Sequence, residues 1–275
     1  MKSLNLVGCG RAAQTLAHLW RRDAIFEIGD VLTRSRHSAE AACRFIGGGV
    51  PIESIVAMRH ADVWLIGVPD REITATAERL AASGRVRAGD GVFHLSGFTP
   101  SSALSALATR GARCASVHPV LSFADPASAV HQFRGSLCGI EGDAALCEEL
   151  AGALTAVGSE PFPVDAARKP LYHAGSVFAS NFIVVIMDVA RRAYLEAGVP
   201  ESVADRLMAP LARHALDNVL TRGAAASLTG PAARGDHDVV SVQQGALSSW
   251  DAASGEAYAA LTALAYRLAG RDPAE

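Results

Sequence analysis

A turn with two glycines follows the first apolar run of this sequence and leaves few folds open to the chain. Leu4–Val7 is typical of a short strand, and the next six residues have the spacing G-x-G-x-x-A before a helical segment, Ala12–Trp20. The first glycine of such a unit permits the tight turn, the second lets backbone approach a pyrophosphate, and the alanine lets the helix pack on the strand. The N–H groups that open the helix attract phosphate.

We therefore predict that this loop binds a dinucleotide. The alternative is an ordinary tight turn between a strand and a helix, which the same spacing can produce. The predicted loop residues are Gly8, Cys9, Gly10, Arg11 and Ala12.

Short apolar runs alternate with helical segments as far as Asp165. Strands that are apolar throughout and separated by helices imply a parallel sheet covered on both faces. We expect an α/β fold with an N-terminal Rossmann domain, residues 1–165, built on a doubly wound parallel sheet. After the first strand, the predicted strands are Ile28–Thr33, Val63–Val68, Val92–Leu95, Cys114–Val117, Leu137–Ile140 and Phe162–Val164.

Strand signals stop after Asp165, so residues 166–275 are expected to form an all-α domain for substrate binding and dimerisation. Ala166–Ala197 fits one long helix, and Glu201–Leu220 fits a second that Pro210 should kink or divide. Gly223–Gly235 is expected to be a connection of small residues, and Gly255–Leu268 a closing helix.

The second strand runs into Thr33-Arg34-Ser35-Arg36, where enzymes that use NAD usually carry an acid. Arginine offers bidentate donors to phosphate oxygens, so we predict NADP, with Thr33, Arg34 and Ser35 around its 2′-phosphate. Asp30 is the rival residue, although it lies inside the strand. Arg34 and Arg36 could instead be solvated loop charges.

Two further strand ends fall on the same edge of the predicted sheet, where ligands of doubly wound folds bind. Val68-Pro69 and Ser96-Gly97 are therefore predicted to lie along the cofactor. Ordinary turn chemistry would explain Pro69 and Gly97 almost as well.

Composition narrows the possible partners. The net charge of −3 gives no reason to expect nucleic acid or a membrane surface, and the most apolar stretch, Phe178–Val189, is too short to span a bilayer. No signal peptide is recognisable, and five scattered cysteines favour reduced thiols, so we expect a cytoplasmic protein. No metal-binding spacing occurs, and Ser96 lacks the flanking glycine of a serine hydrolase.

Several segments together resemble a known superfamily. Gly8–Ala13, Thr33-Arg34-Ser35 and Gly67–Asp70 resemble pyrroline-5-carboxylate reductases and the wider 6-phosphogluconate-dehydrogenase-like group. A bacterial family that joins a Rossmann-like domain to a C-terminal domain of unknown function is a closer match. The segments that resemble it are His94–Gly97, His118–Phe123, Tyr172–Ala174 with Ser180-Asn181, and Leu228–Asp236.

This resemblance covers nearly the whole chain and implies the fold and NADP binding, but no substrate. Members of the superfamily commonly dimerise through the helical domain, so a homodimer is expected. A lysine and an asparagine often occupy the first helix of that domain. Here Lys169, His173 and Asn181 are spaced by multiples of four residues on the predicted long helix.

His173 is our candidate general acid, because a histidine pKa is easily tuned. Asn181 could hold the substrate oxygen or the nicotinamide amide, and Lys169 is a candidate for substrate binding. The alternative is that His173 and Asn181 are buried polar groups at an interface.

Two more residues are candidates for chemistry. His118 precedes Pro119 after a strand, and similar dipeptides occur in prephenate-dehydrogenase-like enzymes, where the histidine takes part in the reaction. It could equally cap the strand. Arg234 could bind a substrate carboxylate, or it could belong to a salt-bridged turn with Asp236.

These features predict an NADP(H)-dependent oxidoreductase that acts on a small polar metabolite by hydride transfer. Two alternatives remain open. One is a non-catalytic NADP(H) sensor or regulatory dimer, and the other is a prephenate-dehydrogenase-like enzyme.

Overall fold

The computed structural model describes residues 1–271 and divides into two compact units, Met1–Val177 and Phe178–Glu275. The first unit is built on one eight-stranded sheet with the strand order β3-β2-β1-β4-β5-β6-β7-β8. The strands are β1 (Lys2–Val7), β2 (Phe26–Leu32), β3 (Val50–Ile52), β4 (Val63–Ile66), β5 (Gly91–His94), β6 (Arg113–Val120), β7 (Leu137–Gly142) and β8 (Glu160–Pro163). This mostly parallel sheet confirms the predicted α/β class.

One strand pair corrects the expectation of a wholly parallel sheet, because β7 runs antiparallel to β6. An antiparallel neighbour needs no crossover helix that packs on a face of the sheet, and the chain between these strands carries only the short helix α5 (Pro126–Gln132). The edge strand β3 was not predicted. It has three residues and includes Pro51, which an edge strand tolerates.

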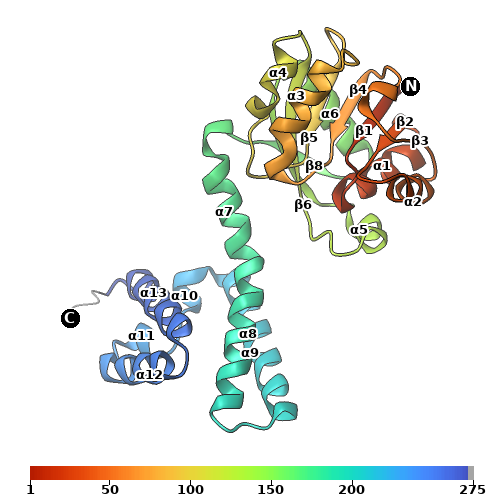
Figure 1. The fold of residues 1–275 in the computed structure, drawn as a ribbon. Helices are drawn as coiled ribbons and strands as arrows, with labels where there is room; N and C mark the ends of the chain where they lie inside the picture. Colours follow the sequence, from red (N-terminus) through yellow and green to blue (C-terminus); the bar gives the residue numbers. More distant parts are fainter. Residues whose placement is uncertain (272–275) are drawn as a thin grey trace. The chain divides into compact units, whose positions relative to one another are not determined.

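Helices cover both faces of the sheet and create two apolar cores (Figure 1). The core around Trp20 contains residues of α1 (Arg11–Arg22), α2 (Arg36–Ile46), α5 and α6 (Ala144–Ala156). The opposite core, around Trp64, contains residues of α3 (Ile73–Ala82) and α4 (Ser105–Ala108). Successive strands therefore present side chains to both cores, which explains why their runs are apolar throughout.

The all-α character predicted for the rest of the chain is confirmed. A 3₁₀ turn, η4 (Ala166–Arg168), precedes the first helix. The helices are α7 (Lys169–Ala179), α8 (Asn181–Glu196), α9 (Glu201–Arg222), α10 (Ala224–Ser227), α11 (Pro231–Arg234), α12 (His237–Trp250) and α13 (Ala252–Leu268). The single long helix expected over 166–197 is interrupted at Ser180, whose φ of −134° and ψ of −68° are not helical.

Pro210 lies inside α9 without dividing it, and α12 was not predicted. The segment expected to be an irregular connection carries the short helices α10 and α11. Arg192 of α8 donates to Asp251, between α12 and α13, and lies over the Trp250 ring at 5.2 Å. Charged and aromatic contacts therefore join the helices of the second unit.

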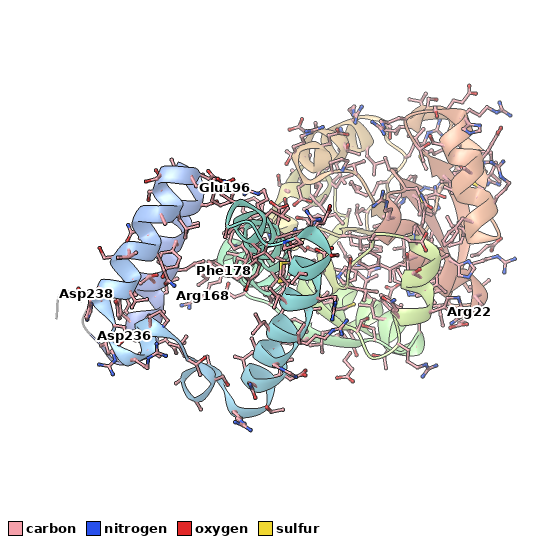
Figure 2. The ribbon with its side chains drawn as sticks, turned by 90° about the horizontal axis from the view of Figure 1, so that it is seen from below. Arg22, Arg168, Phe178, Glu196, Asp236 and Asp238 are labelled. Carbon is pink, nitrogen blue, oxygen red and sulfur yellow. The ribbon has the colours of Figure 1, made fainter. Side chains whose placement is uncertain are left out.

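The structure places the boundary between compact units later than the predicted position near Asp165. The sheet ends with β8, but the first turns of α7 remain bonded to it through Lys169 and Tyr172, so the second unit begins at Phe178, which is labelled in Figure 2. By length and composition alone, the segment Ala166–Glu196 could cross a membrane, with a mean hydropathy of 1.5 over its most apolar window, none of which is buried.

Candidate functional site

The glycine loop has the geometry of a close approach between two strand ends. Gly8 follows β1 with a φ of +81°, and a methyl group built on it would lie 2.4 Å from Val68 Cγ1. A methyl group on Gly67, after β4, would lie 2.8 Å from Ala13 Cβ. Small residues at these positions let α1 begin directly against the sheet, which agrees with the role predicted for Ala13.

The N-terminus of α1 suits an anion. Gly10 precedes the helix without a side-chain cap, and the first turn carries no acidic residue. Burial, with a smaller contribution from Cys43, raises the pKa of Cys9 to about 12, so the thiol in the loop stays protonated at neutral pH. Cys9 therefore contributes backbone and a small apolar side chain.

A cavity of about 620 Å³ adjoins this loop, and its volume suits a nucleotide moiety. Arg34 is exposed and lines this cavity, whereas Arg36 donates to Glu40 and Glu53. Of the two arginines considered from the sequence, Arg34 is thus the one presented to a ligand. The cavity is lined by Val7, Gly8, Leu32, Thr33, Arg34, Glu53, Ser54, Ile55, Val56, Val68, Glu72, Thr76, Arg79, Ala82 and Ser83.

Two other residues predicted beside Arg34 make local bonds. Ser35 caps α2 by accepting from Ser38 N, and Thr33 Oγ1 donates to Ser35 O. Arg79, on α3, is a second cation in the cavity that sequence reasoning missed. Its position six residues after the start of α3 gave no signal that its side chain would line the cavity beside the end of β2.

The side chain of Ser96 is committed to the protein. Its hydroxyl donates to Asp70 Oδ2 at 2.7 Å and accepts from the backbone N–H groups of Phe98 and Thr99. His94, fully buried in β5, accepts from Ser96 N through Nδ1. These bonds hold the strand end that was predicted to lie along the cofactor, so Ser96 shapes the loop and its hydroxyl has no spare proton for a ligand.

Lys169 is buried, with an exposed fraction of 2%. Its Nζ donates to Ser96 O at 2.8 Å and to Ser116 Oγ at 2.5 Å, and lies 3.4 Å from Glu141 Oε1. Burial lowers the pKa of Lys169, and Glu141 opposes this shift. Lys169 was predicted to bind substrate, but its ammonium is bonded to Ser96 after β5, to Ser116 within β6 and to Glu141 on β7.

Two histidines meet at the carboxyl ends of β5 and β6. A methyl group built on Gly97 would lie 2.7 Å from His118 Nε2 and 2.7 Å from His173 Cδ2. The two imidazole centroids are 5.8 Å apart. The structure therefore brings together His118, His173 and Gly97, which the sequence analysis selected from three separate segments.

Tyr172 completes this cluster and was not predicted. Its Oη lies 2.8 Å from His118 Nδ1, and the two rings are perpendicular. Burial, with smaller electrostatic contributions from His173 and Lys169, lowers the pKa of His118 to about 4. His118 is therefore neutral at physiological pH.

The remaining predicted residues belong to the second unit. Asn181 begins α8, and its Oδ1 accepts from Ser180 Oγ. Arg234 Nε donates to Asp236, labelled in Figure 2, as the salt-bridged turn proposed as its alternative role requires. Their parts in substrate binding stay predictions. Within residues 1–271 no cluster suited to a metal ion is found.

Family comparisons agree with this architecture. Residues 2–119 match a Rossmann-like domain, and residues 136–265 match a domain of unknown function, DUF2520. The chain thus joins a Rossmann-like domain to a DUF2520 domain, and this combination confirms the resemblance inferred from its motifs. No curated protein sequence matches the chain.

Solved structures share the fold over nearly the whole length. Protein TM1727 from Thermotoga maritima is 26% identical with a TM-score of 0.74, and the match covers 97% of this chain and 98% of that one. A "putative NADP oxidoreductase" from Bacteroides fragilis has 19% identity, a TM-score of 0.75 and the same coverage. An imine reductase from Myxococcus stipitatus, in complex with NADP⁺, has 15% identity and a TM-score of 0.68, with 96% and 93% covered.

A prephenate dehydrogenase from A. aeolicus, the enzyme type considered as an alternative, is a weaker match. It is 14% identical with a TM-score of 0.51, and only 62% of each chain is covered.

Proposed function

We propose that this protein is an NADP(H)-dependent oxidoreductase that acts on a C=O or C=N bond of a small polar metabolite. The observation that carries the proposal is the pair His118 and His173, both packed against Gly97, at the sheet edge that also bears the glycine loop. In doubly wound folds this carboxyl edge is where dinucleotides bind. Several neighbours with this fold are described as NADP enzymes or reductases, which supports the assignment.

The residues present fit NADP. Gly8 permits the tight turn against Val68, Gly10 presents no side chain to phosphates at the start of α1, and the adjoining cavity offers Arg34 to a 2′-phosphate. Bound NADPH would supply the hydride. The chain's own contribution would be to bind the cofactor, to orient the substrate with the imidazoles of His118 and His173, and to provide a proton.

The test is a titration followed by turnover. We expect purified protein to bind NADPH more tightly than NADH, and to oxidise NADPH with at least one member of a panel of imines and keto acids, or to reduce NADP⁺ with one of their reduced counterparts. Absence of binding for both dinucleotides at millimolar concentration would refute the proposal. The variant His173→Ala should bind NADPH normally and lose turnover.

A second candidate, a non-catalytic NADP(H) sensor, is favoured by one observation. His173 stands near the place where the superfamily often carries a lysine, and Lys169, one turn earlier, is buried against Ser96, Ser116 and Glu141. A sensor would bind NADPH without turnover, and its partner binding would depend on the cofactor's redox state. Full function of His173→Ala in cells would support it.

We further infer that the protein is a homodimer that associates through its helical domain. Large apolar side chains are exposed along the end of α7 and the start of α8, from 42% to 70% of their surface. They are Phe178, Phe182, Val184, Val185 and Ile186. Contiguous exposed apolar residues of this kind are typical of protein interfaces. A second copy that covers these side chains would bury the apolar surface for which Ala166–Glu196 resembles a membrane span.

A further inference from the structure

The phenol of Tyr172 makes one hydrogen bond among residues 1–271, and that bond is to His118 Nδ1, at 2.8 Å. Tyr172 lies on α7 and His118 lies near the end of β6, so this contact joins a helix to the strand that carries the histidine. A methyl group on Gly139 would lie 2.8 Å from Tyr172 Oη. The absence of a side chain at Gly139 therefore makes room for the hydroxyl.

The direction of this bond determines where His118 carries its proton. A neutral imidazole has one nitrogen that donates and one that accepts. A phenol O–H, whose ordinary pKa is about 10, is a stronger donor than a neutral imidazole N–H. No other acceptor binds Tyr172 Oη within the described part of the chain. Tyr172 therefore donates to Nδ1, and the proton of His118 sits on Nε2.

His118 Nε2 lies on the side of the ring that faces Gly97 and His173. The groups that surround this imidazole are Tyr172 and His173 on α7, Lys169 at the start of α7, and Asp70 after β4. Burial, with smaller electrostatic contributions from His173 and Lys169, keeps His118 uncharged at neutral pH. A neutral histidine acts either as a base through a free lone pair or as a donor through its N–H, and the tautomer decides which.

We propose that Tyr172 is a positioning residue that fixes His118 in the Nε2–H tautomer, so that His118 donates a hydrogen bond to the heteroatom of a C=O or C=N substrate. This inference rests on the proposed function for the identity of the acceptor. Negative charge grows on that heteroatom as the bond is reduced, and a preorganised donor stabilises it. His118 is then not the proton acceptor that oxidation of an alcohol would need.

The tautomer can be measured without cofactor or substrate. Full-length protein labelled with ¹⁵N-histidine is studied by two-bond ¹H–¹⁵N correlation at pH 7.5, and His118→Gln identifies the signals of His118. We expect a non-protonated Nδ1 and a protonated Nε2. In Tyr172→Phe, which keeps the ring and removes the hydroxyl, the two nitrogen shifts should move towards each other as both tautomers become populated.

Phe162→Leu is the matched control, because Phe162 packs on the Tyr172 ring, with centroids 6.1 Å apart, and takes no part in the hydrogen bond. Its His118 shifts should equal those of the wild type. A wild-type Nδ1–H tautomer, or shifts unchanged in Tyr172→Phe, would overturn the inference. Titration of the same samples with NADPH tests the proposed function separately, and Tyr172→Phe should bind NADPH as the wild type does.

Discussion

Asp30, inside β2, accepts hydrogen bonds from both the backbone N–H and the guanidinium of Arg59, with an Nε–Oδ1 distance of 3.0 Å. The Asp30 side chain has no exposed surface, and its backbone N–H donates to Asn5 Oδ1. A carboxylate bound in this way is not free to accept from ribose hydroxyls. The acidic residue at the spacing typical of NAD enzymes therefore has a structural partner, which supports the choice of NADP.

Replacement of Arg34 should change cofactor preference. Arg34→Ala removes a charged donor from the cavity, and hydrogen bonds to charged groups contribute about 1.5–3 kcal/mol, so NADPH affinity should fall about ten- to a hundredfold. NADH affinity should change little, because NADH lacks the 2′-phosphate. Isothermal titration calorimetry with both cofactors measures this difference.

Arg36→Ala is the control for that experiment. Arg36 is bound to Glu40 and Glu53, so its loss should leave the ratio of the two affinities nearly unchanged. If Arg34→Ala and Arg36→Ala lost equal amounts of NADPH affinity, net charge alone, and not a specific contact, would attract NADPH.

Removal of the Lys169 ammonium should destabilise the sheet domain. Lys169→Met leaves Glu141 buried without its cation, and breaking a buried pair costs about 3–5 kcal/mol. Urea denaturation measures the free energy of unfolding. The double variant with Glu141→Gln should recover part of the loss, because it removes the uncompensated charge.

Lys2→Met provides the comparison for a surface pair. Lys2 lies 2.7 Å from Glu149, but half of its side chain is exposed, so the change should cost less than about 1 kcal/mol. If Lys169→Met and Lys2→Met lowered the free energy of unfolding by similar amounts, the structural role assigned to Lys169 would be wrong.

Mild acid should destabilise the protein through His94. Burial lowers the pKa of His94 to about 4, whereas an unfolded histidine has a pKa of about 6.5. As pH falls through about 6.5 the unfolded chain binds the proton first, so stability decreases, by about 1.6 kcal/mol for this group between pH 6.5 and 5. The dependence becomes negligible above about pH 8.

Urea midpoints at pH 7.5, 6 and 5 test this behaviour. In His94→Asn, whose amide oxygen can still accept from Ser96 N, part of the pH dependence should be lost, and His118 should supply the remainder. An unaltered slope in His94→Asn would mean that other groups cause the acid sensitivity.

The sequence predicted features that depend on local physics. Gly8, Gly10 and Ala13 mark a strand–turn–helix unit because small residues are needed there, and runs that are apolar throughout mark strands covered on both faces. The direction of β7 left no such signal, because a buried strand has the same residue pattern whether it runs parallel or antiparallel to its neighbour. Ser180 also gave no warning of the break between α7 and α8.

The candidate site was predicted only in part, since its contacts join distant segments. His118 and His173 were selected by motif and by helical spacing, and the structure brings them together. The bond between His118 and Tyr172 spans 54 positions and depends on the register of β6 against β7, which places Gly139 opposite His118. No local pattern carries that register, so Tyr172 was missed.

A charge on the exposed apolar surface of α8 should prevent dimerisation. In Val184→Asp, an aspartate would have to lose its water in the interface, which should weaken association by at least about tenfold. Sedimentation velocity at micromolar concentration should show a dimer for the wild type and a monomer for the variant. Val56→Asp, at a similarly exposed valine of the first unit, should remain dimeric. A monomeric wild type would refute the proposed dimer, and a dimeric Val184→Asp would mean that the interface lies elsewhere.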